Sequence, residues 1–291
     1  MELISDYMRD VHKRHMLNEL TRKTFGFDFE GWVTGGYFEG DYIPYSFEED
    51  GRIISNVSAN RMRFMQNGTV KNYIQIGTVM TACERRGQGL AAKLIRHVIG
   101  TYENECDGIY LFGNLGAAGF YHKAGFTVMN QYRYSVKEEF CRSDKNAEAF
   151  RPVKEMDVAV KNKYRELVRE SAPHSSFEQI NKFGLQMFYT AGFENVFYAE
   201  DLDCFIVTEH DGSTVLQSVL SKDKVPLTDV LKRMDLSDNK CMLGFTPLEE
   251  DMDKCVGVPY DGGDDYRLFC WKDGMGSIEN ERLYFPELSH A

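Results

Sequence analysis

A glycine-rich turn in the first third of the chain has the residue types and spacing needed to bind phosphate groups. Residues 86–91 read RGQGLA and lie between a strand-like run, 73–81, and a helical pattern that continues to residue 98. Glycine lets a backbone approach a ligand closely. The first N–H groups of a helix lack internal partners and lie at the positive end of the helix dipole. With Arg85 and Arg86 beside them, they predict a pyrophosphate site, although a tight turn without a ligand has the same pattern.

Two other phosphate-binding loops fit this turn poorly. A Rossmann loop has a third spaced glycine and belongs to a parallel sheet, whereas this turn follows strands that read as an antiparallel meander. A loop for ATP ends in Gly-Lys-Ser or Gly-Lys-Thr, and residues 86–91 do not. The residues downstream therefore decide what the turn binds.

A second informative segment follows after one further strand. Residues 114–126 read NLGAAGFYHKAGF, which predicts a short helix of small residues that ends at a glycine. Together the two segments resemble the motifs of the GNAT (Gcn5-related N-acetyltransferase) superfamily over about residues 1–136. The residues that carry the resemblance are Arg86, Gly89 and Ala91 in the first motif, and Asn114, Ala117, Tyr121, Gly125 and Phe126 in the second.

The resemblance implies an N-acetyltransferase that uses acetyl-CoA as co-substrate and needs no metal. It also implies that the strand before the turn diverges from the next strand, so that the pantetheine arm lies in the gap and pairs with unpaired strand groups. Asn114 is also a favoured residue for an ordinary helix N-cap. The residues implied to bind acetyl-CoA are Val79, Met80, Thr81, Arg86, Gly87, Gln88, Gly89, Leu90, Ala91, Asn114, Ala117 and Tyr121.

Tyr121 is the implied catalytic residue. In the family, a tyrosine at this place lies near the CoA sulfur and protonates the departing thiolate. A phenol with a pKa near 10 can supply a proton to a thiolate with a pKa near 8.5, and a hydrogen bond alone would also help. The alternative is a half-buried ring that packs the helix on the sheet.

The acceptor site and its general base are less defined. Some family members carry a glutamate on the strand before the turn, and Gln75 stands there in this chain. The segment 25–45 is where the family builds the acceptor site, and its acidic and aromatic residues could line a pocket or belong to solvated loops and core. The candidate substrate residues are Trp32, Tyr37 and Glu39, beside Glu30, Asp41, Tyr42 and Tyr45 in the same segment.

The elements that position these residues are predicted from periodicity and turn residues. Residues 4–23 have the apolar spacing of a helix. Asp50-Gly51 and Asn67-Gly68 predict tight hairpins between the strands 42–47, 53–64 and 70–81. A helix from residue 90, a strand at 108–112 and a strand at 126–136 then predict a crossover and a parallel strand pair.

The second half is predicted to repeat this order without the phosphate turn. Residues 154–170 and 176–192 read as helices, followed by strands at 196–199, 204–209 and 214–219, with Asp211-Gly212 between the last two. A helix at 227–234 and strands at 240–245 and 266–271 complete the half. We expect an α/β protein with mixed sheets: a GNAT-like domain at 1–140, a linker at 141–150, and a degenerate GNAT-like α/β domain at 151–291.

The composition of the chain indicates which partners, location and cysteine chemistry to expect. The chain has 291 residues and a net charge of −11, which disfavours nucleic acid as a partner. No apolar run approaches the roughly 20 residues that span a bilayer, and the N-terminus lacks signal-peptide features, so we expect a cytoplasmic protein with no membrane partner. The seven widely spaced cysteines favour neither disulfides nor a zinc site.

The combined expectation is transfer of an acetyl group directly to a primary amine of a small molecule or peptide. The alternative is a regulatory or sensor module that binds CoA without turnover, which the glutamine at position 75 favours and Tyr121 opposes. A homodimer is left open.

Overall fold

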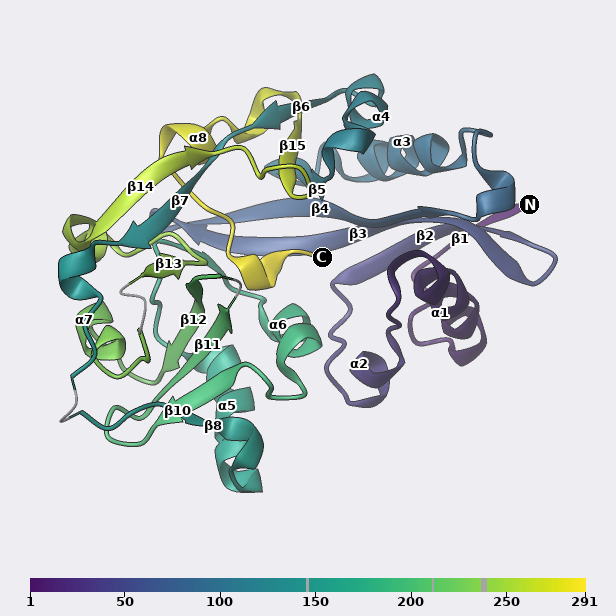
Figure 1. Ribbon diagram of the computed structural model, residues 1–291. Coiled ribbons are helices and arrows are strands. Elements are labelled where there is room, and N and C mark those ends of the chain that lie inside the picture. Colours follow the sequence, from purple (N-terminus) through teal and green to yellow (C-terminus); the bar gives the residue numbers. More distant parts are fainter. Residues whose placement is uncertain (145–146, 211, 237–239) are drawn as a thin grey trace.

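The computed structural model describes residues 1–144, 147–210, 212–236 and 240–291, which form two mixed sheets (Figure 1). The first sheet has the order β1-β2-β3-β4-β5-β15-β6, and the short strand β9 pairs with β3. Its strands are β1 (Glu2–Ser5), β2 (Tyr42–Glu49), β3 (Arg52–Gln66), β4 (Thr69–Thr81), β5 (Gly108–Gly113), β6 (Phe126–Met129), β9 (Phe177–Gln179) and β15 (Arg267–Trp271).

The second sheet repeats the arrangement of the first. Read from its other end, its order is β8-β10-β11-β12-β13-β7-β14, and β12–β13 is the parallel pair, as β4–β5 is in the first sheet. Its strands are β7 (Gln131–Val136), β8 (Arg151–Pro152), β10 (Val196–Ala199), β11 (Cys204–His210), β12 (Thr214–Ser221), β13 (Cys241–Leu243) and β14 (Cys255–Tyr260). The predicted α/β class with a second GNAT-like unit is therefore confirmed.

The two sheets exchange one strand each. Strand β7 follows β6 directly along the chain but inserts between β13 and β14 of the second sheet. In return, β15 comes from the end of the chain and inserts between β5 and β6 of the first sheet. The strand predicted over 126–136 is therefore two strands in different sheets. The division at 140–150 stays a prediction, since no single cut separates the sheets.

Helices cover both faces of the first sheet (Figure 1). On one face, Leu94 and Val98 of α3 are fully buried against the sheet. On the other, Leu17 of α1 and the ring of Phe29 before α2 pack in a separate cluster. The helices are α1 (Val11–Phe25), α2 (Glu30–Thr34), α3 (Leu90–Tyr102) and α4 (Ala118–Lys123), with α5 (Val158–Glu170), α6 (Phe183–Thr190), α7 (Leu227–Leu231) and α8 (Ser277–Asn280) in the second half.

The two hairpin predictions in the first sheet are confirmed by the backbone. Asp50 and Gly51 have φ of 51° and 72°, and Asn67 and Gly68 have φ of 47° and 74°. Positive φ at both central residues is what a two-residue hairpin turn requires. These turns set the register of the antiparallel strands that lead to the glycine-rich turn at residues 86–91. Asp211, in the third predicted turn, lies outside the described residues.

Two predicted helices begin later than their apolar spacing suggested. Residues 2–5 form an edge strand on β2, and α1 begins only after Asp10, whose carboxylate accepts the Lys13 N–H at 3.0 Å. In the second half, residues 177–179 pair with β3 before α6 begins at Phe183. In both places strand pairing with a distant segment outweighed local helical periodicity.

Candidate functional site

The glycine-rich turn has the geometry expected for a phosphate-binding helix start. Gly87 and Gly89 have φ of 79° and 71°, and Gly89 is the N-cap residue of α3. A Cβ atom on either glycine would meet nothing within 4 Å, so both glycines are needed for backbone conformation and leave space above the turn. The first N–H groups of α3 therefore face an open, exposed surface.

Next to this turn, β4 and β5 separate. They pair from Tyr73–Gly108 to Gln75–Tyr110 and then diverge, although β4 continues to Thr81. The divergence predicted from the family resemblance is thus present.

A bulge interrupts the β3–β4 ladder, opposite the edge of β4 that β5 leaves free. Between the pairs Asn56–Met80 and Ser58–Gly77, β4 has one residue more than β3, and Thr78 has a φ of 40°. A bulge leaves one residue out of the ladder and turns its backbone groups aside. The bulge therefore changes the direction of the backbone N–H and C=O groups of Thr78 and Val79, which lie beside the gap.

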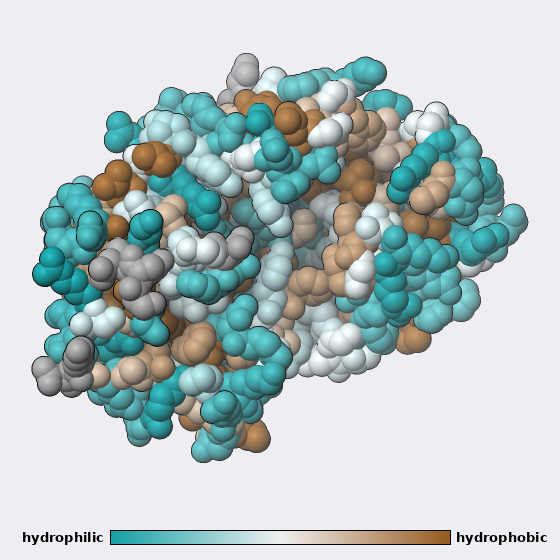
Figure 2. All heavy atoms as spheres, viewed as in Figure 1, coloured by the Kyte–Doolittle hydropathy of each residue, from teal (hydrophilic) through white to brown (hydrophobic). Residues whose placement is uncertain are grey.

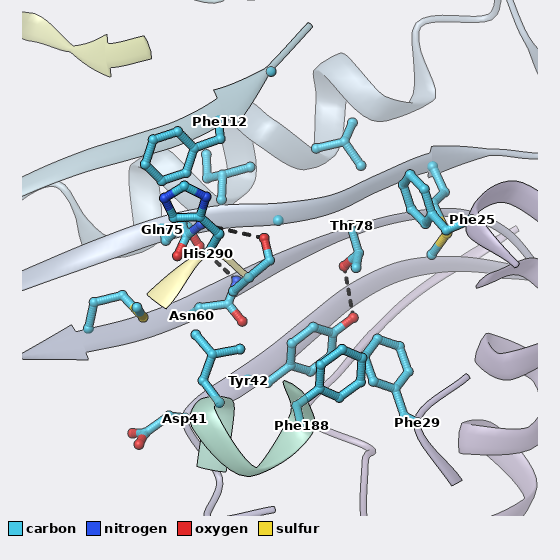
Figure 3. Close-up of a pocket in the computed structure, with 18 of the residues that line it drawn as sticks. Phe25, Phe29, Asp41, Tyr42, Asn60, Gln75, Thr78, Phe112, Phe188 and His290 are labelled. Atoms are coloured by element: carbon cyan, nitrogen blue, oxygen red, sulfur yellow. Dashed lines mark hydrogen bonds between the residues drawn. The ribbon is translucent and has the colours of Figure 1, made fainter. Parts of the chain in front are cut away.

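A pocket of about 710 Å³ lies at this gap, and its lining includes residues of α3 and α4 as well as residues of α1 and α2. Figure 2 shows a hollow between the two parts of the molecule, and Figure 3 shows part of the lining. Of the predicted residues, those that line the pocket are Val79, Met80, Thr81, Ala91, Asn114, Ala117, Tyr121, Trp32 and Glu39. The pocket therefore brings residues of both predicted motifs together with part of the predicted acceptor segment.

The remaining predicted residues lie outside the pocket lining. Arg86, Gly87, Gln88 and Gly89 form the turn near its mouth, and Leu90 is buried at the start of α3. Arg86 donates from Nε to the backbone oxygen of Thr81 at 3.3 Å. Tyr37 packs away from the pocket against Phe183, with ring centroids 6.2 Å apart.

Tyr121 is placed on α4 with its ring against the sheet. It is 7% exposed, and its ring centroid lies 5.3 Å from that of Phe269 in the exchanged strand β15. Burial raises the pKa of the Tyr121 phenol to about 12, so it is neutral near pH 7. Its hydroxyl group bonds to no residue that the structure describes. The side chain thus packs against the sheet and also lines the pocket.

Asn114 acts as a local cap as well. Its Oδ1 accepts the Ala117 N–H at 2.9 Å at the start of a 3₁₀ turn, Leu115–Ala117. The capping role uses the side-chain oxygen, which leaves the amide N–H groups as donors for a ligand.

The acceptor side of the pocket contains two carboxylates with different surroundings. Glu39 forms an ion pair with Arg169 of α5. Asp41 accepts a hydrogen bond from Asn181 Nδ2 at 2.9 Å, and partial burial raises the pKa of its carboxyl group. Glu39, the predicted substrate residue, is thus neutralised by a partner that the sequence did not indicate.

Gln75 is buried and forms part of the pocket floor. Its Nε2 lies 3.5 Å from a backbone oxygen of Ala291, and its Oε1 lies 3.5 Å from the Tyr110 hydroxyl. Next to it, Asn60 Nδ2 donates to the Gln75 backbone oxygen at 2.9 Å and to Ser58 Oγ at 3.1 Å. Figure 3 shows Gln75 and Asn60 of this polar floor, which is built from amide, hydroxyl and backbone groups.

Several lining residues come from parts of the chain to which sequence analysis assigned no function. The imidazole of His290 stacks on Phe112 with centroids 3.8 Å apart, and burial lowers its pKa to about 3, so it is neutral. Tyr189 donates its hydroxyl to the His290 backbone oxygen at 2.5 Å. The residues in question are Asn181, Gly184, Leu185, Phe188 and Tyr189 near α6, and Asp265, Tyr266, His290 and Ala291 near the end of the chain. No local pattern marks them, because tertiary contacts alone bring them to β4.

The second sheet contains an equivalent gap that its own chain fills. Strands β12 and β13 pair only through Leu216–Leu243, while β12 continues to Ser221. Gly244 then bonds back to β12, and the Glu287 N–H donates to the Gly244 oxygen at 2.9 Å. Leu288 and Ser289 are buried beside Gln217 and Val219, around a residual cavity of about 40 Å³. The segment 286–289 thus occupies the place that the pocket holds in the first sheet.

Within the described residues, no group of three or more His, Cys, Asp or Glu side chains is arranged to hold a metal ion. No helix in the described part of the chain is both long and apolar enough to cross a bilayer.

Comparisons with known proteins show which solved structures share this architecture. Three solved structures match over 92% of this chain, and at their low identities they share its fold. One, from Enterococcus faecalis V583, is described as a conserved protein of unknown function and probable N-acyltransferase (TM-score 0.54, 12% identity, 72% of that chain covered). The others are a GCN5-related N-acetyltransferase from Kribbella flavida (0.52, 15%, 70%) and Eis1 from Mycobacterium abscessus (0.53, 12%, 73%). A search of curated proteins finds no match.

The mixed sheet that opens beside a glycine-rich helix start belongs to a fold shared with solved structures that are described as N-acyltransferases and N-acetyltransferases. More particularly, residues 32–129 match the family model described as an acetyltransferase (GNAT) domain, and this part of the chain is a GNAT domain. The family resemblance inferred from residues 86–91 and 114–126 is therefore confirmed.

Proposed function

We propose that this protein is an acetyl-CoA-dependent N-acetyltransferase that transfers the acetyl group directly to a primary amine. The observation that carries the proposal is one pocket that contains the diverging edges of β4 and β5, the Tyr121 ring and the Asp41 carboxylate. The α3 turn at its mouth would hold the pyrophosphate, and the gap would hold the pantetheine arm. The thioester would then lie near the bulge of β4.

In the proposed reaction, the neutral amine attacks the thioester carbonyl carbon and forms the C–N bond. The carbonyl oxygen becomes an oxyanion, for which the backbone N–H of Val79 is the proposed donor. Collapse of this intermediate breaks the C–S bond, and the sulfur leaves with the bonding electron pair. The ammonium proton passes to solvent or a nearby base, so that the products are the N-acetylamine and CoA thiol.

Tyr121 is the proposed donor to the departing sulfur. A phenol with a pKa of about 12 stays protonated near pH 7, but it gives its proton up less readily than an exposed tyrosine. A hydrogen bond that strengthens as thiolate charge develops, followed by proton transfer, fits this pKa best. The phenolate would regain its proton from solvent.

A second candidate function is a CoA-binding sensor without turnover. The observation that favours it is Gln75, which lines the pocket and whose side-chain amide cannot act as a base. The two functions share acetyl-CoA binding but differ in thioester cleavage.

The test is an assay of CoA thiol release from acetyl-CoA with a panel of primary amines, together with thermal unfolding. Acetyl-CoA at 100 times its Kd should stabilise the fold by about 2.7 kcal/mol. Amine-dependent thiol release supports the transferase. Stabilisation without release for any amine supports the sensor, and no stabilisation contradicts both.

A further inference from the structure

The acceptor side of the pocket has a wall of aromatic rings drawn from both halves of the chain. Phe27, Phe29 and Trp32 come from the segment around α2, whereas Phe188 comes from α6. The Phe188 ring centroid lies 5.4 Å from that of Phe27, 6.1 Å from Phe29 and 5.8 Å from Trp32. At these distances the rings contact one another, so the wall is continuous. Figure 3 shows Phe29 and Phe188 side by side near Tyr42.

Further aromatic side chains stand exposed around the same pocket. Phe25 and Tyr189 are each 49% exposed, and Tyr266 is 59% exposed, although all three line it. Large apolar side chains gathered at a concave site are typical of ligand binding, because a ligand can cover them.

The polar groups of this wall are largely bonded within the protein. Trp32 donates its indole N–H to a backbone oxygen of α6 at 2.6 Å, and the Tyr42 hydroxyl lies 2.8 Å from that of Thr78. The Asn181 amide group donates to Asp41 and to a backbone oxygen of β3. An acceptor with many hydroxyl groups would lose its hydration here and find few replacement partners.

The charges of the pocket favour a cation. Its lining contains the carboxylates of Glu39, Asp41 and Asp265 and one guanidinium, that of Arg61. Glu39 is already paired with an arginine, whereas the hydrogen-bond partner of Asp41 is a neutral amide. An ammonium group beside Asp41 would stabilise its charged form and offset the cost of its partial burial. Asp41 is therefore the group best placed to attract an ammonium ion.

We infer that the acceptor is an arylalkylamine, a primary amine on a flat apolar body. Its ring would lie against Phe27, Phe29, Trp32 and Phe188, and its ammonium group would approach Asp41 before it loses a proton and attacks. This inference rests on the proposed acetyl transfer and names the substrate class of that same pocket.

The first test compares two amines with the same reacting group and different bodies, 2-phenylethylamine and 2-aminoethyl β-glucoside. Burial of the ring should make kcat/KM at least about tenfold higher for 2-phenylethylamine. Equal or better transfer to the glucoside overturns the substrate class and leaves the transferase intact. Absence of transfer to both of these and to every other amine tested overturns the proposed function itself, as does absence of acetyl-CoA binding.

The second test removes one ring of the wall. Phe188→Ala should lower kcat/KM for 2-phenylethylamine about tenfold, chiefly through KM, and leave the glucoside value and the acetyl-CoA Kd unchanged. Phe197→Ala is the matched control, because Phe197 is a partly buried ring on β10 that lies outside the pocket. Phe188→Leu keeps most of the volume and should retain part of the effect if Phe188→Ala disturbs folding. A Phe188 variant that changes neither amine, or both equally, contradicts the inference.

The third test addresses the ammonium partner. Asp41→Asn keeps the shape but removes the charge, and it should raise the KM for 2-phenylethylamine about tenfold, as expected for loss of a hydrogen bond to a charged group. Inhibition by 2-phenylethanol, which has the same ring but no charge, should be the same in the variant and the wild type. An unchanged KM would contradict the assignment of Asp41.

Discussion

Tyr121 has a structural role, which its packing shows, and a chemical role, which we propose. Its ring packs against β15, its side chain lines the pocket, and burial raises the phenol pKa to about 12. A purely structural tyrosine would have the same burial, so the position alone does not separate the two roles. A variant that removes only the hydroxyl oxygen of Tyr121 and keeps the ring tests the chemical role separately from the packing role.

We predict that Tyr121→Phe lowers kcat by about 10²–10⁴-fold and barely changes the Kd of acetyl-CoA, as expected for loss of a general acid. Steady-state kinetics with any accepted amine would measure this. Tyr102→Phe is a suitable control. It loses a buried hydrogen bond to Tyr45 in the same core, so it should cost about 0.5–1.5 kcal/mol of stability with kcat unchanged. A Tyr121 variant that keeps more than half of wild-type kcat would show that water can protonate the thiolate or that chemistry is not limiting.

At the scale of elements, two features produce the pocket: the start of α3 and the divergence of β4 from β5. Pairing of these strands stops after Gln75–Tyr110, and the glycine turn then brings the α3 N–H groups to the mouth of the gap. The turn needs positive φ at Gly87 and Gly89 and open space above them. A ligand phosphate group can use both properties.

We predict that Gly89→Val abolishes measurable binding of acetyl-CoA, because its side chain would fill the space that a phosphate group needs and its φ of 71° would be strained. Isothermal titration of the folded variant would measure this. Gly51→Val is the matched control, since Gly51 has a φ of 72°, would place a Cβ atom in open space with nothing within 4 Å, and belongs to a hairpin outside the pocket. Both variants should lose similar stability, about 1–2 kcal/mol. Unchanged affinity in Gly89→Val would remove the turn from the binding site.

At the scale of the whole molecule, the two sheets have the same strand order, but the gap between two strands is open in the first sheet and filled in the second. Each gives a strand to the other, so β15 from the end of the chain supports Tyr121 in the first sheet. The gap of the second sheet is filled by residues 286–289, and the last residues then continue to the pocket of the first. The second unit therefore contributes α6 and the chain end to the pocket while its own gap is closed.

We predict that each chain binds one acetyl-CoA. Isothermal titration should give one site per chain for the wild type and no remaining site for Gly89→Val, because residues 286–289 pair into the gap of the second sheet and the sequence after residue 150 does not repeat the glycine-rich turn. Two equivalent sites in the wild type, or one residual site in the variant, would contradict this prediction.

The sequence by itself determined the features whose signals lie within a few neighbouring residues. Asp50-Gly51 and Asn67-Gly68 specified their hairpins, and the segments 86–91 and 114–126 specified the family and the side of the pocket at which we propose that acetyl-CoA binds. These features depend on backbone preferences and helix starts, which are local physical properties. The tertiary structure alone decided the exchange of β7 and β15 and the aromatic wall completed by Phe188. Both require contacts between segments far apart in the chain, and long-range packing leaves no periodic pattern or turn residue by which a single sequence could reveal it.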